Sequence, residues 1–226
     1  MQSACGKPCA LCMEAHAMDG QRKISGAVIR RLPGYYRYLC RLESEGVERI
    51  ASHELGQQMG LTASQIRQDI NCFGGFGQQG YGYNVPELRQ RMGEILGLDS
   101  SYRVAIVGAG KIGQAILCYE GFRDMNFVPI AIFDSDPALI GRSVRDLTVS
   151  DVSKLSDVLT KTPADIGVVA VPEQHAQQVC DELVRCGVRA IWNFAPIDLA
   201  AGHDVAINNV HLSDSLMVLT YSLRHM

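Results

Sequence analysis

The segment Arg103–Gly113 has the sequence RVAIVGAGKIG, an apolar run followed directly by the pattern G-x-G-x-x-G. Short β-branched runs are typical of strands buried in a parallel sheet. In a dinucleotide-binding turn, the first glycine permits the bend, the second lets a pyrophosphate approach the backbone, and the third lets the helix pack closely on the strand. The free amides at the helix start then face the phosphates. We therefore predict that the coenzyme is bound by Gly108, Ala109, Gly110, Lys111, Ile112 and Gly113.

An acidic residue follows at the spacing that this fold requires. Asp134 comes directly after the apolar run Val128–Phe133, 21 residues beyond Gly113. An acid at about this distance accepts hydrogen bonds from the adenosine ribose. A 2′-phosphate at the same place would meet a like charge, at a cost of about 1–4 kcal/mol at 4 Å. NAD(H) is therefore favoured over NADP(H) as the coenzyme.

Strand and helix patterns continue to alternate beyond this turn, which predicts a doubly wound α/β domain. Val171 and Pro172, like Phe194–Pro196, follow predicted strand ends, where the nicotinamide ring should lie. An apolar ring site favours the neutral reduced ring over the cationic oxidised ring. Further strands are expected at 166–171, 188–192 and 204–208, and helices near 112–120, 152–159 and 174–186. The last helix is predicted to be capped by Ser213 and to run toward Arg224.

The preceding part of the chain predicts three short helices. The first spans Arg31–Leu42 with Pro33 near its start and Gly46 after its end, and the second spans His53–Met59 with Ser52 as its cap. Thr62–Gln65 has the form of a capping box for the third. Short helices joined by a tight turn are typical of a helix-turn-helix.

The third helix has one apolar and one polar face. Ile66, Ile70 and Phe73 share one side, and Ser64, Gln68 and Asn71 share the other, with Arg67 on the flank. Arg67 suits guanine or a phosphate, and Gln68 suits adenine. Glycines alternate with aromatic residues over 74–83, which predicts a hairpin wing, and Pro86 then opens a helix over 87–96.

Composition and charge narrow the classes of protein. The chain has 226 residues, 47% hydrophobic and 20% charged, which excludes disordered and fibrous classes. Residues 21–91 carry ten basic and six acidic side chains, whereas residues 92–226 carry ten and sixteen. One domain alone is thus expected to have an anionic partner. No apolar run reaches the ~18 residues of a membrane span, and residues 1–19 lack a secretory signal, so we expect a cytoplasmic protein without membrane association.

Catalysis is not expected from this sequence. Only 113 residues follow Gly113, and the strand pattern uses most of them to complete the sheet. His175 and His203 lie in contexts typical of surface or capping histidines. Cys5, Cys9 and Cys12, with His16, have spacing that could hold zinc or part of an iron–sulfur cluster, but no fold pattern surrounds them, and we predict a disordered extension without metal. Coenzyme binding without an enzyme's machinery indicates a sensor.

Taken together, the sequence resembles the Rex family of bacterial redox-sensing transcriptional repressors over residues 24–224. The resemblance is carried by five stretches: SQIRQD at 64–69, the glycine-aromatic wing at 73–83, the turn 108–113, FDSDP at 133–137 and NFAP at 193–196. It implies a homodimer whose winged helices bind a palindromic operator in double-stranded DNA and whose Rossmann domains bind NADH or NAD⁺. It further implies that NADH releases the DNA. The full predicted DNA-contacting set is Ser64, Gln65, Arg67, Gln68, Asn71, Gln79 and Tyr81.

The resemblance also implies a polar link between the two domains. Arg37, Tyr119 and a residue near position 211 would form it. The family usually has an aspartate at this last position, and here it is His211. Either Asp214 replaces it, or the coupling is weaker or pH-dependent. Gln68 and Gln79 stand where the family commonly has basic residues, which predicts a shallower salt dependence or an altered operator.

The expected organisation has four parts. Residues 1–20 form the extension, 21–99 the winged-helix domain with a linker helix, 100–212 the Rossmann domain and 213–226 a C-terminal helix. With Leu216, Leu219 and Leu223 on one face, this helix either clasps a partner subunit, as in the family, or packs on its own domain. Three functions remain: the sensor; an enzyme, as a small NAD-dependent dehydrogenase or acyl-CoA-ligase-type protein with an N-terminal oligomerisation module; and a winged helix that binds protein.

Overall fold

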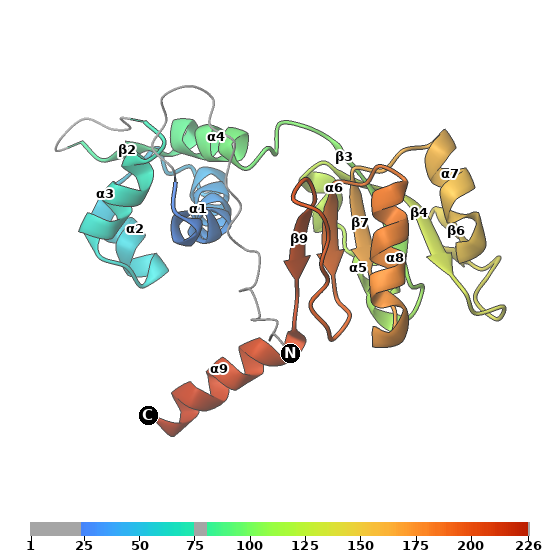
Figure 1. Cartoon of the computed structure of the whole chain (residues 1–226). Helices are drawn as coiled ribbons and strands as arrows, with labels where there is room; N and C mark the ends of the chain where they lie inside the picture. The colour runs from blue at the N-terminus through green and yellow to red at the C-terminus, as the bar shows by residue number, and fades with distance from the viewer. Residues whose placement is uncertain (1–23, 75–80, 226) are drawn as a thin grey trace. The chain divides into compact units, whose positions relative to one another are not determined.

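The computed structural model describes residues 24–74 and 81–225. These residues divide into two compact units, with the division after Ser100. We call the unit that ends at Ser100 the N-terminal unit and the one that begins at Ser101 the nucleotide unit (Figure 1).

The described part of the N-terminal unit is built on four helices around one core. They are α1 (Gly26–Ser44), α2 (Ser52–Met59), α3 (Ala63–Asn71) and α4 (Val85–Ile95). Helix α1 begins earlier than predicted, because Ser25 caps it and its buried stripe at helical spacing already begins at Val28 and continues to Leu42. Pro33 therefore lies inside the helix rather than near its start. Burial of this stripe outweighs the loss of one backbone hydrogen bond at an internal proline. Gly46 follows the end of the helix at φ 75°, as predicted.

In the N-terminal unit, the cap of α2 differs from the prediction and the capping box of α3 is only half formed. Ala51, not Ser52, precedes α2, and the Glu54 carboxylate accepts a hydrogen bond from the Ala51 amide at 2.8 Å. The Thr62 hydroxyl caps α3 by accepting from the Gln65 amide at 3.2 Å, as predicted. The reverse half of this capping box is absent, because the Gln65 side chain donates to Asp69 instead.

The predicted wing falls partly on residues 75–80, which lie outside the described residues. Beyond these residues, strand β2 (Tyr83–Asn84) pairs antiparallel with strand β1 (Arg49–Ile50). The sequence did not predict this pairing. Gly82 has φ 71°, and a Cβ there would lie 2.6 Å from the Ile50 carbonyl oxygen. Glycine is therefore required where the chain enters this pairing.

The nucleotide unit contains a seven-stranded sheet in the order β5-β6-β4-β3-β7-β8-β9. All pairs are parallel except β5 with β6. The six parallel strands follow the dinucleotide-binding order 3-2-1-4-5-6, with its reversal between β3 and β7. Their bounds are β3 (Tyr102–Val107), β4 (Phe127–Asp134), β5 (Ser143–Val144), β6 (Leu147–Asp151), β7 (Ile166–Val169), β8 (Ala190–Asn193) and β9 (Ala206–Asn209).

Helices cover both faces of this sheet (Figure 1). Helices α7 (Leu155–Lys161) and α8 (Glu173–Arg185) pack in one apolar core, and α5 (Lys111–Cys118) packs in the other. A short 3₁₀ turn, η1 (Val152–Lys154), precedes α7, and α6 (Gly121–Asp124) follows α5. The sequence missed α6, β5 and β6, because these elements are short and interrupted by polar residues.

The C-terminal helix differs in its exposure from the other helices that the structure describes. Helix α9 (Leu212–Arg224) is preceded by His211, whereas the sequence predicted Ser213 as its cap. The Asp214 amide donates to the His211 carbonyl oxygen at 3.1 Å, which sets the start of the helix before Ser213. Every residue of α9 is exposed, including the predicted face of Leu216, Leu219 and Leu223.

Candidate coenzyme site and DNA-reading helix

Two of the three motif glycines are required by close backbone contacts. At Gly108, with φ 104°, an added Cβ would lie 2.3 Å from the Ala170 carbonyl oxygen. At Gly113, it would lie 1.8 Å from the Gly108 carbonyl oxygen. These contacts allow no side chain, so the turn and the start of α5 can be this compact only with glycine.

Gly110 is different, because no heavy atom lies within 4 Å of the position its Cβ would occupy. It is the exposed residue before α5, and its carbonyl accepts the first intrahelical bond, from the Gln114 amide at 3.0 Å. The amides of Lys111, Ile112 and Gly113 come before that bond, at the positive end of the helix dipole. The open side of Gly110 therefore leaves room for an anionic group beside these amides.

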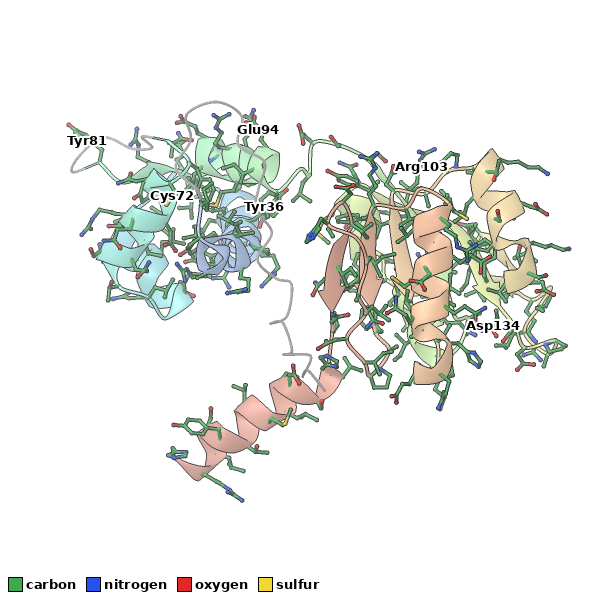
Figure 2. The ribbon with its side chains drawn as sticks, viewed as in Figure 1. Tyr36, Cys72, Tyr81, Glu94, Arg103 and Asp134 are labelled. Carbon is green, nitrogen blue, oxygen red and sulfur yellow. The ribbon has the colours of Figure 1, made fainter. Side chains whose placement is uncertain are left out.

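Asp134 lies at the carboxyl end of the sheet, beside this turn (Figure 2). Its Oδ2 accepts a hydrogen bond from the Ala109 amide at 2.6 Å, and its Oδ1 accepts one from the Asp136 amide at 2.9 Å. Each carboxylate oxygen keeps further acceptor capacity for a ribose hydroxyl. The side chain of Ala109 is fully buried, so its role in the turn is through the backbone.

The other predicted coenzyme residues lie across the point where the strand order reverses. Strand β7 ends at Val169, two residues earlier than predicted, and Val171 Cγ1 lies 3.2 Å from the position of a Gly108 Cβ. Pro172 is exposed directly before α8. The structure thus brings Val171 against the glycine turn, at the place where ligands bind in open α/β sheets.

A buried asparagine, which the sequence did not indicate as a functional residue, organises the loop after β8. Asn193 is fully buried and donates from Nδ2 to the Ile197 carbonyl at 2.7 Å and to Asn209 Oδ1 at 2.9 Å. Its Oδ1 accepts from the Ala195 amide at 2.9 Å. The sequence offered one sign of this role, since Asn193 is a polar residue at the end of an apolar strand. These bonds fix the backbone of the NFAP stretch, next to the predicted ring site.

Helix α3 presents the polar face that the sequence predicted. Ser64, Arg67, Gln68 and Asn71 are exposed, while Ile66 and Ile70 are fully buried. Arg67 Nη1 donates to the Ser52 hydroxyl at 3.0 Å. Of the predicted wing contacts, Tyr81 is 69% exposed, and Gln79 lies outside the described residues.

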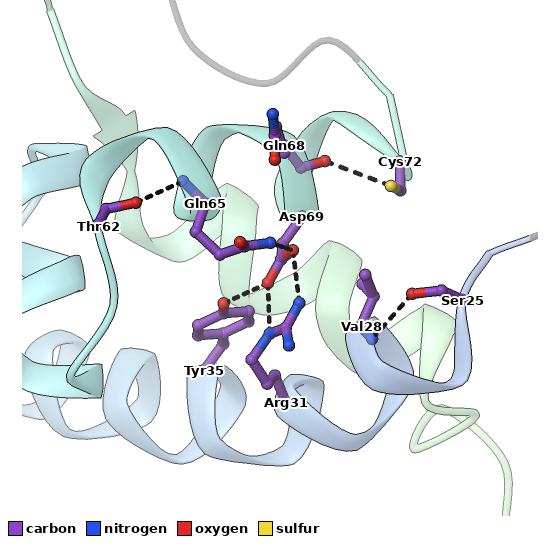
Figure 3. Close-up of polar contacts among 9 residues, drawn as sticks. All are labelled: Ser25, Val28, Arg31, Tyr35, Thr62, Gln65, Gln68, Asp69 and Cys72. Atoms are coloured by element: carbon purple, nitrogen blue, oxygen red, sulfur yellow. Dashed lines mark hydrogen bonds and ion pairs between the residues drawn. The ribbon is translucent and has the colours of Figure 1, made fainter.

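Gln65 was also predicted to contact DNA, but its side chain belongs to a hydrogen-bond network that the sequence did not reveal (Figure 3). Its Nε2 donates to Asp69 Oδ1 at 2.9 Å, and Asp69 is 1% exposed. Arg31 and Tyr35, both on α1, bind the same carboxylate. Burial alone would raise the pKa of Asp69, but hydrogen bonds from these three side chains outweigh it and lower the pKa. Burial, together with the hydrogen bond to Asp69, raises the pKa of Tyr35.

The predicted interdomain link is divided between the two units: Arg37 lies in the N-terminal unit, and Tyr119 and His211 lie in the nucleotide unit. Arg37 is exposed on α1 of the N-terminal unit. Tyr119 is 57% exposed and meets the Phe122 ring edge-on at 4.8 Å. His211 Nε2 lies 2.9 Å from Asp198 Oδ1, and this hydrogen bond raises the pKa of His211. The link itself therefore remains a prediction.

The search for a metal site and for a membrane-spanning helix covers only the described residues. Among residues 24–74 and 81–225, no group of three or more His, Cys, Asp or Glu side chains could hold a metal ion. Cys5, Cys9 and Cys12 lie outside this range. None of the described helices is both long and apolar enough to cross a bilayer.

Comparison with known families and relatives agrees with this geometry. Residues 99–197 match the CoA binding domain family, and residues 23–71 match the family described as "Putative DNA-binding protein N-terminus". The chain is 54% identical over 206 residues to the "Redox-sensing transcriptional repressor Rex" of Clostridium beijerinckii, covering 91% of this chain and 98% of the relative. It is 55% identical over 203 residues to the protein of the same name from Clostridium kluyveri, covering 90% and 97%.

Solved structures show the same similarity. The crystal structure of RSP in complex with beta-NAD⁺ and operator DNA matches with a TM-score of 0.85 and 52% identity, covering 91% of this chain and 94% of that chain. RSP in complex with beta-NADH matches with a TM-score of 0.84 and 49% identity, covering 91% and 96%.

Proposed function

The chain belongs to the Rex family of redox-sensing transcriptional repressors, and from this premise we propose that it represses transcription by binding operator DNA and releases that DNA when NADH binds. One observation carries the proposal. A single chain holds an open glycine turn beside Asp134 at the reversal of the sheet, and an exposed polar face on α3. RSP, which matches 91% of this chain, is described in complex with beta-NAD⁺ and operator DNA and in complex with beta-NADH.

The nucleotide unit fits NAD(H). The amides at the start of α5, beside the open Gly110, would hold the pyrophosphate, and Asp134 would hold the adenosine ribose. Lys111 and Ile112 are exposed at this position. Bound NAD(H) supplies a nicotinamide ring whose charge reports the redox state, since only the oxidised ring is cationic. Val171, Pro172 and Phe194 would give that ring an apolar surrounding that favours the reduced form.

The N-terminal unit would bind the DNA. The exposed Ser64, Arg67, Gln68 and Asn71 lie on the face of α3 that would enter a major groove, with Tyr81 contributing from the wing. One short helix reads few base pairs, and a two-fold dimer with half-sites ~34 Å apart supplies the remaining specificity. We infer that α9 provides the dimer contact, because its large apolar side chains are all exposed in the single chain.

The repressor is proposed to act without catalysis. The relatives are described as transcriptional repressors and not as enzymes. A substrate-dependent absorbance change at 340 nm would instead support a dehydrogenase. Because a repressor must reach the chromosome, we place the protein in the bacterial cytoplasm.

The function is tested by fluorescence anisotropy on a palindromic operator, titrated separately with NADH and NAD⁺. We expect NADH to release the operator at concentrations where NAD⁺ does not. A hundredfold difference in the ratio of DNA-free to DNA-bound states corresponds to about 2.7 kcal/mol of differential coenzyme binding. Equal effects of the two coenzymes, or no effect of either, would disprove the redox response. DNA retention that is insensitive to sequence would argue against operator recognition.

A further inference from the structure

Asp69 is an acidic side chain buried within the helix that carries the predicted base contacts. It is 1% exposed, and its two oxygens accept four hydrogen bonds. Arg31 donates from Nε at 2.7 Å and from Nη2 at 2.8 Å, and Tyr35 donates from its hydroxyl at 2.6 Å. Gln65 donates from Nε2 at 2.9 Å. Figure 3 shows these three side chains converging on the carboxylate. Its acceptor capacity is thereby filled without water.

The network joins α1 to α3 in a way that fixes the rotation of α3 about its axis. An Arg–carboxylate pair with two parallel hydrogen bonds is planar and tolerates little change of angle. The fully buried Ile66 and Ile70 also hold the inner face of α3 in the core. If α3 rolled, both bonds from Arg31 would break and a charge would stay buried without a partner, which is strongly unfavourable.

The network and the reading face lie on different sides of α3. At 100° per residue, Ser64, Arg67 and Asn71 project about 140–160° away from Asp69, and Gln68 projects about 100° away. Gln65 projects only about 40° from Asp69, on the side of the network. Its amide is already bound to the carboxylate.

We propose that Asp69, clamped by Arg31 and Tyr35 of α1, is a positioning residue that sets the rotation of the recognition helix, and that Gln65 supports this clamp instead of contacting a base. The inference rests on the proposed operator binding and refines it. It replaces the expectation that Gln65 belongs to the DNA-contacting set.

A positioning residue and a base-contacting residue affect DNA recognition differently. A side chain that contacts one base pair relaxes discrimination at that pair when it is removed, and leaves the other positions unchanged. A residue that sets the helix rotation moves all the contacting side chains together. Its loss therefore lowers the affinity for the operator and for each single-base-pair variant of it by the same factor. Binding to nonspecific DNA is kept, because it depends on phosphate contacts.

The test uses the full-length protein in four variants: Arg31→Met, Arg31→Lys, Gln65→Met and Gln68→Met. Gln57→Met is the matched control, since Gln57 is an exposed glutamine on α2. Kd is measured on the operator, on each single-base-pair variant of it and on nonspecific DNA. Far-ultraviolet circular dichroism and thermal unfolding verify folding at the assay temperature, and an NADH titration counts intact nucleotide units.

We expect Arg31→Met to weaken operator binding at least tenfold with unchanged nonspecific affinity, and Arg31→Lys, which keeps the charge but not the fork, to weaken it less. Gln65→Met should weaken binding two- to fivefold by the same factor on every operator variant, whereas Gln68→Met should relax one position. If Arg31→Met fails to fold, Arg31→Lys and Gln65→Met still decide the outcome.

Relaxed discrimination at a single base pair in Gln65→Met would overturn the proposal for Gln65. An unchanged ratio of operator to nonspecific affinity in folded Arg31→Met or Arg31→Lys would overturn the clamp. A wild-type protein that does not prefer the operator would refute the proposed function itself, which separates the two failures.

Discussion

The open side of Gly110 makes a specific prediction for the variant Gly110→Ala. The residue has φ −72° and ψ −168°, which any residue adopts, and the added methyl group would contact no heavy atom within 4 Å. Alanine is a somewhat poorer residue than glycine before a helix, so the free energy of unfolding should fall by less than about 1 kcal/mol. By contrast, Gly113→Ala would place Cβ 1.8 Å from the Gly108 carbonyl oxygen and should disrupt the unit.

Coenzyme binding should respond much more strongly than stability. The methyl group would occupy the space through which the pyrophosphate approaches the amides at the start of α5. The loss of one hydrogen bond to a charged group costs about 1.5–3 kcal/mol, which corresponds to a rise of about 10- to 150-fold in the Kd for NADH. The operator should still be bound, but its release should need correspondingly more NADH.

Isothermal titration with NADH, thermal unfolding and operator anisotropy measure these three quantities on the same protein. Gly202→Ala is the matched control, because Gly202 also has open space around its Cβ position and lies in the loop before β9. It should change none of them. If Gly110→Ala binds NADH with wild-type affinity, the opening at Gly110 does not admit the pyrophosphate and the assignment of this turn is wrong.

Three further predictions follow from the charges and exposures of the nucleotide unit. Asp134→Asn should narrow the preference for NADH over NADPH by about fivefold or more, because the repulsion of a 2′-phosphate is removed; parallel titrations with both coenzymes measure the ratio. The pKa of His211 should lie above 6.5 and fall toward it in Asp198→Asn, as measured by NMR. The stabilisation from this pair is present below pH 6.5 and is lost as the pH rises through the higher folded-state pKa; an unchanged titration would show that the pair does not form. Leu219→Asp, on the exposed face of α9, should raise the dimer Kd at least tenfold in sedimentation experiments, given about 1.5–3 kcal/mol for a buried leucine; an unaltered dimer would exclude this face.

Local sequence patterns predicted most of the elements because their causes are local. The β-branched runs form β3 and β4. On α3, the apolar Ile66 and Ile70 are buried and the polar face is exposed, as the helical periodicity indicated. Strand β6 was missed because its sequence, LTVSD, carries too few apolar residues to show a pattern. It becomes a strand through its pairing with β4.

The candidate site was predicted unevenly for the same reason. The glycine turn and Asp134 have a fixed spacing along the chain, and the structure brings them within hydrogen-bond distance. Asp69 has no such signature, since an acid on a helix is normally exposed. Only the arrival of Arg31 and Tyr35 from α1 makes its burial possible.

The sequence by itself determined the glycine turn, the acid Asp134 at its spacing from that turn and the amphipathic pattern of α3, because steric limits on glycine and the helical repeat act within a few residues. The tertiary structure alone decided three features. Gly110 is the motif glycine that faces open space, the side-chain amide of Gln65 is bound to the buried Asp69 carboxylate, and His211 forms a hydrogen bond with Asp198. These depend on groups far apart in the chain, whose distances are set by packing and not by spacing in the sequence.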